Sequence, residues 1–226
     1  MVLELNGREK CREFYGDHTE QMPNLIADGR TPMSVAELIQ IRLDVRNSPD
    51  SIKSIWMDNY FDTGDSVAYH PDGNLKIVLD SPYFRDINPD TPRNIFGALI
   101  LTEDVYNALE GEEFKKGKSG KVDELLSKKD VKSHPVWKIL ARDQTLLNEY
   151  ADLVFAEAKE RFGYNTAMGI FLRSADGENP EMRGLGIYRL EGRSSANGRD
   201  FIGSNHGRLL GMAPKVQELK SLEGKL

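Results

Sequence analysis

The sequence predicts an α+β fold in which a mostly antiparallel sheet packs against a long helix over about residues 135–162. Two observations predict it. Runs rich in β-forming residues cluster at 51–101 and again at 164–190, and a stretch with helical periodicity separates them. These runs do not alternate one by one with helices, as they would in a doubly wound fold. The 226 residues fit a single α+β domain over 34–226, preceded by an irregular N-terminal arm over 1–33.

The arm is expected to be irregular because turn signals such as Tyr15-Gly16-Asp17 and Asp28-Gly29-Arg30 recur in it. The first helix then begins at a capping box. Ser34 and Glu37 have the spacing at which each side chain satisfies a free backbone donor of the other. Pro49 ends this helix, since the residue before a proline prefers extended geometry.

The stretch 51–101 is expected to hold strands and tight turns. Asp62-Thr63-Gly64-Asp65 has the composition of a turn. Asp72-Gly73 lies between β-rich runs and predicts a hairpin, because glycine accepts the positive φ that such a turn needs. The run from Ile95 to Leu101 lacks polar alternation, which predicts a buried strand.

The longest predicted helix follows a charged linker. Pro135 suits its first position, where a missing N–H leaves no bond unmade, and Gly163 suits the left-handed residue that closes a helix. Strands over 166–172 and 184–190 complete the sheet. Between Pro135 and Gly163 an apolar stripe recurs at three- and four-residue steps: Trp137, Leu140, Leu147, Ala151, Val154, Ala158 and Phe162.

Composition narrows the class of protein. The net charge is −6, and this acidic balance disfavours a nucleic-acid partner, because binding to phosphates needs a basic field. No apolar run approaches the ~20 residues needed to cross a bilayer, and the first residues lack the pattern of a secretory signal. Cys11 has no second cysteine to pair with. We therefore expect a cytoplasmic protein without a membrane partner.

The segment from Arg183 to Arg208 carries the main functional hypothesis. Between residues 161 and 214 every basic residue is an arginine, and half of the glycines of the chain lie there. Arginine grips phosphate or carboxylate with a planar fork, and glycine lets backbone donors approach an anion. The segment thus predicts a site for a small phosphate-bearing ligand, in a binding protein or an enzyme. We expect Arg193, Arg199 and Arg208 to hold the anion beside Gly203 and Gly207, with His206 as the catalytic acid or base.

Other interpretations stay open. The arginines can instead belong to solvated turns, paired with nearby acids. Asp58, Asp62 and Asp65 can supply oxygen ligands for magnesium or calcium in a metal-dependent hydrolase. The N-terminal arm can pack on a second copy and form a homo-oligomer without catalysis.

Established catalytic motifs do not decide between them. The run from Gly111 to Gly117 has five residues between its glycines, where a P-loop has four. Zinc-ligand pairs and a serine-nucleophile elbow are absent from the sequence. The sequence therefore names neither a reaction nor a cofactor.

Overall fold

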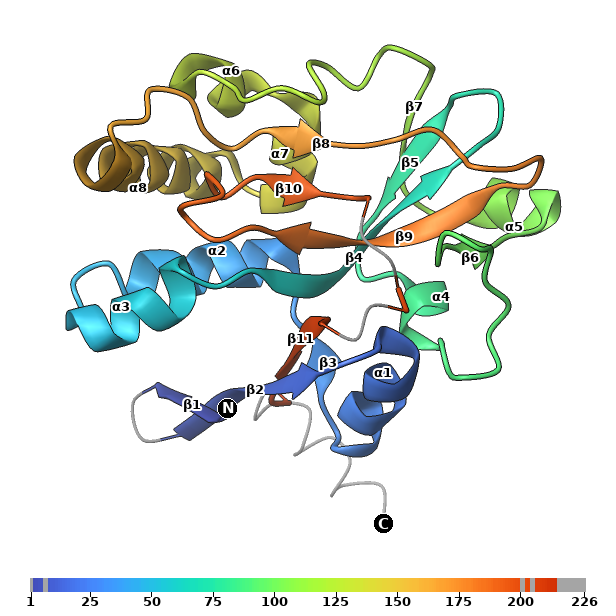
Figure 1. Cartoon of the computed structure of the whole chain (residues 1–226), viewed down its shortest axis with the longest axis horizontal. Helices are drawn as coiled ribbons and strands as arrows, with labels where there is room; N and C mark the ends of the chain where they lie inside the picture. The colour runs from blue at the N-terminus through green and yellow to red at the C-terminus, as the bar shows by residue number, and fades with distance from the viewer. Residues whose placement is uncertain (1, 6–7, 200–201, 204–205, 215–226) are drawn as a thin grey trace.

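The computed structural model describes residues 2–5, 8–199, 202–203 and 206–214, and within them eleven strands form one mixed sheet (Figure 1). The strands are β1 (Val2–Leu5), β2 (Arg8–Tyr15), β3 (Thr31–Pro32), β4 (Phe61–Tyr69), β5 (Leu75–Val78), β6 (Leu99–Ile100), β7 (Glu112–Phe114), β8 (Ile170–Phe171), β9 (Glu181–Ile187), β10 (Ala196–Asn197) and β11 (Arg208–Met212). Their order is β1-β2-β11-β4-β9-β10-β8, with β3 beside β11, β5 beside β4 and β7, and β6 beside β9. The pairs β11–β4 and β10–β8 are parallel and the other pairs are antiparallel, which confirms a mostly antiparallel sheet.

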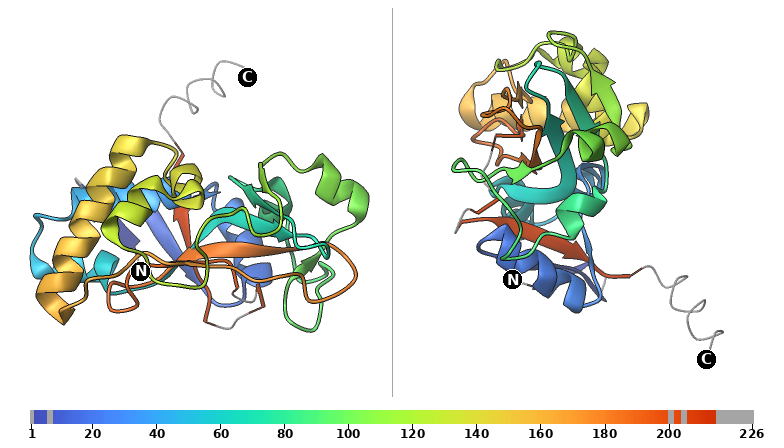
Figure 2. Two further views of the ribbon diagram at one scale, coloured as in Figure 1. Left: turned by 90° about the horizontal axis from the view of Figure 1, so that it is seen from above. Right: turned by 90° about the vertical axis from the view of Figure 1, so that its right-hand side faces the viewer.

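The helices contribute to two core clusters that contain residues from opposite faces of β4. They are α1 (His18–Ala27), α2 (Val35–Asp44), α3 (Asp50–Met57), α4 (Pro82–Arg85), α5 (Glu103–Ala108), α6 (Lys128–Ser133), α7 (Pro135–Ala141) and α8 (Gln144–Phe162). Helices α2, α6 and α7 pack on α8, and α1 lies against β2 and β11. Figure 2 shows α8 and α5 at opposite ends of the long axis. None of the described helices is long and apolar enough to cross a membrane. The predicted α+β class is confirmed.

Strands β4 and β9 lie at the centre of the sheet and are buried on both faces. Along β4 the side chains alternate between two core clusters: Val67 and Tyr69 belong to one and Ala68 to the other. The first cluster includes residues of α2, α7 and α8, and the second includes residues of α1, α4 and α5. A strand covered on both faces needs no polar alternation.

The long helix is confirmed as a helical region, but it is divided in two. Arg142 ends α7 in a left-handed conformation with φ of 61°. Asp143 then caps α8, because its carboxylate accepts a hydrogen bond from the N–H of Leu146 at 2.7 Å. The start at Pro135 and the closure at Gly163, with φ of 72°, are as predicted.

Two local signals are also confirmed. Ser34 and Glu37 form a reciprocal capping box at the start of α2. Strands β4 and β5 form a hairpin whose turn contains Gly73 with φ of 91°. Both depend on groups only a few residues apart, which is why the sequence alone predicts them.

The prediction of irregular structure over residues 1–33 is wrong. Strand β2 pairs with β1 and β11, and Cys11 is buried in the larger core cluster. Asp17 begins α1 by accepting a hydrogen bond from the N–H of Thr19 at 2.8 Å. Five of the eight residues of β2 are charged, which is atypical of a strand, and Pro23 lies inside α1. Contact of this segment with a second copy stays a prediction.

Two turn and strand assignments need correction as well. Asp62 to Asp65 lie inside β4, where the register with β9 shifts, and do not form a turn. Of the run predicted as a buried strand, Leu99–Ile100 forms β6, whereas Ile95 is 92% exposed. The side chain of Asn94 accepts hydrogen bonds from the N–H groups of Phe96 and Ala98 at 3.0 Å, and this closes a turn instead of extending the strand.

Candidate functional site

The turn between β9 and β10 forms one wall of a pocket. Arg193 and Ser194 are consecutive non-glycine residues with positive φ, 63° and 48°. Each such residue costs about 1–3 kcal/mol, and strain of this kind clusters at ligand sites. The pocket has a volume of about 550 Å³ and is called the Arg193 pocket below. Its lining consists of Tyr60, Leu125, Phe171, Tyr188, Arg189, Glu191, Gly192, Arg193 and Ser195.

Arg193 supplies this pocket with an uncompensated positive charge. Its guanidinium donates a hydrogen bond to the hydroxyl of Thr166 at 3.1 Å and lies 4.0 Å from the ring centroid of Tyr164. It forms no ion pair with any residue that the structure describes. Arg189, by contrast, pairs with Glu191 at 3.0 Å on the surface. Arg193 is thus available to an anionic group that enters the pocket.

A buried arginine, Arg42, holds the backbone next to two of the aromatic residues that line the pocket. Arg42 is fully buried in α2 and donates to three carbonyl oxygens, those of Trp56 (2.9 Å), Asn59 (3.1 Å) and Tyr188 (3.2 Å). It also donates to the hydroxyl of Tyr150 at 2.7 Å. These bonds fix the end of α3 against the segment after β9. Arg42 therefore positions two backbone segments that carry pocket side chains.

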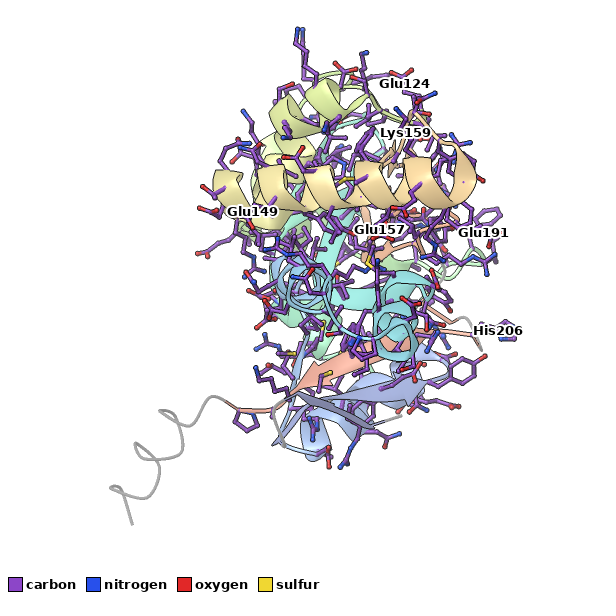
Figure 3. The ribbon with its side chains drawn as sticks, turned by 90° about the vertical axis from the view of Figure 1, so that its left-hand side faces the viewer. Glu124, Glu149, Glu157, Lys159, Glu191 and His206 are labelled. Carbon is purple, nitrogen blue, oxygen red and sulfur yellow. The ribbon has the colours of Figure 1, made fainter. Side chains whose placement is uncertain are left out.

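A second, more polar pocket adjoins the first and shares Tyr60 and Arg189 with it. The imidazole Nδ1 of His206 lies 3.0 Å from the hydroxyl of Tyr15, and Figure 3 shows His206 at the periphery, on the same edge as Glu191. This pocket has a volume of about 530 Å³ and is called the His206 pocket below. Its lining consists of Glu13, Tyr15, Asp58, Asn59, Tyr60, Arg189, His206 and Arg208.

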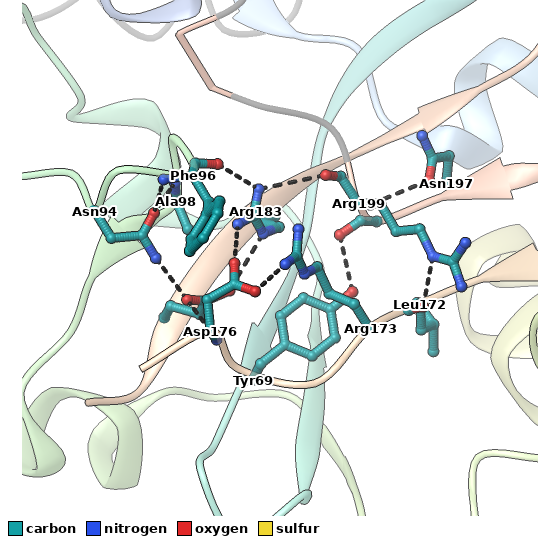
Figure 4. A network of polar contacts seen from close by, with 12 residues as sticks. Tyr69, Asn94, Phe96, Ala98, Leu172, Arg173, Asp176, Arg183, Asn197 and Arg199 are labelled. Carbon is teal, nitrogen blue, oxygen red and sulfur yellow. Dashed lines mark hydrogen bonds and ion pairs between the residues drawn. The ribbon is translucent and has the colours of Figure 1, made fainter. Parts of the chain in front are cut away.

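The predicted arginines do not converge on one pocket. Arg208 lines the His206 pocket but pairs with Glu13, and Arg199 pairs with Asp123. Figure 4 shows why this region is rich in arginine. Arg183 is fully buried, pairs with Asp176 at 2.8 Å, and donates to the backbone carbonyl of Arg199 at 3.3 Å. Most of these arginines therefore join loops. Of the three arginines predicted to hold an anion, Arg193 alone lines the Arg193 pocket, and its role toward an anion stays a prediction.

The two predicted ligand glycines lie elsewhere. A Cβ at Gly207 would fall 2.4 Å from the carbonyl oxygen of Gly16 and 2.6 Å from the ring of His18. A Cβ at Gly203 would fall 2.7 Å from the guanidinium of Arg93. Gly207 thus allows close packing against the start of α1, and Gly203 allows the close approach of Arg93. They do not line the Arg193 pocket, so their predicted role in that site is corrected.

The three aspartates proposed as metal ligands are held apart by different partners. The described residues contain no group of three or more histidine, cysteine, aspartate or glutamate side chains placed to hold a metal ion. The shared oxygen site that the sequence suggested does not form, because each carboxylate is paired with a different basic side chain. The pairs are Asp58 with Arg161 (2.8 Å), Asp62 with His18 (3.0 Å) and Asp65 with Arg142 (2.9 Å).

Two of these carboxylates have displaced pKa values in opposite directions. Burial alone would raise the pKa of Asp62, but His18 and the backbone N–H of Arg208 outweigh it and hold this pKa below its usual range. Burial raises the pKa of Asp65, and its hydrogen bonds and the charge of Arg142 offset this only in part. Asp62 therefore acts as the anionic partner that joins α1 to the start of β11.

Sequence reasoning missed the aromatic part of the site. Tyr60 precedes β4, Phe171 belongs to β8 and Tyr188 follows β9. Tyr188 lies within the arginine–glycine segment and could have been included on that ground. The other two reach the pocket only through the order of the strands, which no local pattern reveals.

No family model matches the chain, and no curated protein matches it. A solved structure described as "Accommodation of massive sequence variation in Nanoarchaeota by the C-type lectin fold" is similar, with a TM-score of 0.65 and 17% sequence identity. The match covers 92% of this chain and 100% of that chain. At this identity the similarity concerns the fold alone. The architecture is thus an α+β arrangement similar to the C-type lectin fold.

Proposed function

We propose that this chain binds a small, ring-bearing anionic ligand in the Arg193 pocket, with nucleotides and sugar phosphates as the leading class. The observation that carries the proposal is Arg193 itself. Arg193 lines an aromatic-walled pocket, and its guanidinium has no ion-pair partner among the described residues. A guanidinium can bind phosphate oxygens with two parallel hydrogen bonds.

The size and lining of the pocket support this class of ligand. Its volume of about 550 Å³ falls within the ~300–1,000 Å³ of small-molecule sites. Tyr60, Phe171 and Tyr188 give the lining three aromatic side chains, which suit contact with a base or a sugar. The charges of Arg189 and Glu191 cancel, so the charge of Arg193 gives the lining one net positive charge.

The description of the similar solved structure is consistent with a ligand site whose contacts come from loops. That protein is described as accommodating massive sequence variation in the C-type lectin fold. A scaffold that tolerates sequence change is suited to carrying its contacts on connecting segments. In this chain the Arg193 turn and the segment before β4 are such connections.

A thermal-shift panel tests the proposal. The panel contains nucleotides, sugar phosphates and inorganic phosphate, with the uncharged nucleosides and sugars as counterparts. A ligand present at about 100 times its Kd stabilises the folded state by about 2.7 kcal/mol. For a chain of this size that raises Tm by about 5–11 °C. The charged compounds should raise Tm and their uncharged counterparts should not.

Matched variants locate the binding site. Arg193→Ala should abolish the shift, whereas Arg46→Ala should leave it intact, because Arg46 is an exposed arginine outside the pocket lining. His206→Ala should also leave it intact if ligands enter the Arg193 pocket alone. The proposal is rejected if no charged compound raises Tm, or if Arg193→Ala responds like the wild type.

A further inference from the structure

A third pocket, of about 360 Å³, lies between the start of α2, α4 and the ends of β3 and β11. It shares no lining residue with the Arg193 or His206 pocket. Four charged side chains line it: Glu37, Asp80, Arg85 and Arg142. We call it the Arg85 pocket. Its lining carries two cations and two anions and so has no net charge, whereas the lining of the Arg193 pocket has one net positive charge.

Arg85 is the uncommitted cation of this pocket. Its guanidinium forms no ion pair or hydrogen bond with any residue in the described part of the chain, and its Nε is buried without a partner. The Nε is closed to solvent, whereas the two terminal nitrogens are open and also have no acceptor among the described residues. A carboxylate is an acceptor whose planar shape suits a guanidinium. Arg85 can therefore offer its terminal nitrogens to a carboxylate that enters the pocket.

The two acids of the pocket each keep one uncommitted oxygen. Asp80 uses Oδ2 to pair with Arg142 at 2.8 Å, and its Oδ1 accepts no hydrogen bond from a described residue. Glu37 uses Oε2 to accept from the backbone and hydroxyl of Ser34 at 2.9 Å, and its Oε1 accepts no hydrogen bond from a described residue. These oxygens are acceptors suited to an ammonium group. The lining thus offers donors for an anion and acceptors for a cation.

The acidic side of the pocket is rigid and strained. Asp80 and Arg142 are both non-glycine residues with positive φ, 48° and 61°. Their mutual ion pair holds them, and Asp65 accepts from the N–H of Asp80 at 3.0 Å and from Arg142 at 2.9 Å. Strained residues that the surroundings fix in this way cluster at ligand clamps. The charged groups are therefore preorganised, which lowers the cost of ordering them around a ligand.

From this arrangement we propose that the Arg85 pocket binds a zwitterion, namely a free α-amino acid. The carboxylate of the amino acid binds Arg85, and its ammonium group binds Asp80 and Glu37. Pro32 and Met212, which also line the pocket, contact its side chain. A simple anion is disfavoured because the lining has no net charge. The site is independent of the one proposed around Arg193.

Calorimetric titration with the proteinogenic amino acids tests this proposal on the full chain. For the tightest amino acid, two blocked forms are compared: the N-acetyl derivative, which keeps the carboxylate alone, and the amide, which keeps the ammonium alone. Each blocked form should bind at least about tenfold more weakly, since it leaves one charged group of the pocket unpaired. If the N-acetyl derivative binds as tightly as the parent compound, the proposal of a zwitterionic ligand is overturned. It is also overturned if no amino acid gives a binding signal.

Variants separate this site from the Arg193 pocket. Arg85→Ala should weaken amino-acid binding by about tenfold or more, whereas Arg193→Ala and the surface control Arg46→Ala should not change it. If Arg85→Ala does not fold, Arg85→Gln keeps the length of the side chain and should show the same loss. Unchanged affinity in the folded Arg85 variant would refute the proposal, whatever the outcome of the nucleotide panel.

Discussion

Arg42 contributes to stability in a way that one substitution can isolate. Methionine at this position keeps the unbranched apolar stem of the side chain but removes the guanidinium and with it all the donors. Arg42→Met would leave four buried or half-buried acceptors without their donor: the carbonyl oxygens of Trp56, Asn59 and Tyr188 and the hydroxyl of Tyr150. Arg42 has no ion-pair partner among the described residues, so no carboxylate is left behind.

The magnitude follows from the number of acceptors. An unsatisfied buried polar group costs about 1–3 kcal/mol, so four groups at the lower figure give about 4 kcal/mol. In a chain of this length that corresponds to a fall in Tm of about 8–16 °C. A loss of this size is a large fraction of the ~5–15 kcal/mol that stabilises a typical domain.

Urea denaturation of Arg42→Met, Tyr150→Phe and the double variant measures the effect. Tyr150→Phe alone should cost about 1 kcal/mol, because it removes one of these bonds. In the Arg42→Met background it should cost less, since its donor is already gone. A loss below about 1 kcal/mol for Arg42→Met, or strict additivity in the double variant, would refute the reasoning. Arg46→Ala, a surface change, should stay within about 0.5 kcal/mol of the wild type.

Two further predictions concern the packing of α1. Asp62→Asn weakens the buried pair with His18 and should cost about 3–5 kcal/mol at pH 7. The folded pKa of Asp62 is lowered, so its contribution is present above the unfolded pKa of about 3.9 and is lost as the pH falls through the folded value. The gap in urea midpoint between wild type and Asp62→Asn should therefore narrow in acid, and a gap that is constant from pH 7 to pH 3 contradicts this. Gly207→Ala should cost about 1–3 kcal/mol by overpacking, whereas Gly203→Ala meets only the flexible end of Arg93 and should be nearly neutral in the same assay.

Features decided by nearby residues were predictable from the sequence. The capping box of Ser34 and Glu37, the hairpin at Gly73 and the helix end at Gly163 all depend on groups a few positions apart. Strand β2 is not predictable from its charged sequence, because pairing with β1 and with the distant strand β11 stabilises it. The residues from Asp62 to Asp65 have the composition of a turn but lie inside β4, which pairs with β9 on both sides of this segment.

The candidate site likewise contains residues that local sequence predicts and residues that it does not. Arg193 could be proposed from local composition, since arginine and glycine in one loop favour an anion. Its aromatic neighbours Tyr60 and Phe171 come from distant segments that the sheet brings together. The sequence does not indicate a binding role for Arg85, because that role is inferred from the absence of a partner among the described residues. Sequence patterns record which groups are present but not which of them remain unpaired.

The position of β11 between β2 and β4 has a consequence for protein synthesis. Strand β2 and helix α1 leave the ribosome early, whereas β11, which pairs with β2 along its length, is the last described strand to be made. At about 5–20 residues per second, translation delivers β11 on the order of ten seconds or more after β2. During that interval β2 exposes an unpaired edge, which is a template for aggregation. The nascent chain should therefore depend on chaperones until β11 emerges, and a ribosome stalled before residue 208 should hold β2 in a protease-sensitive form.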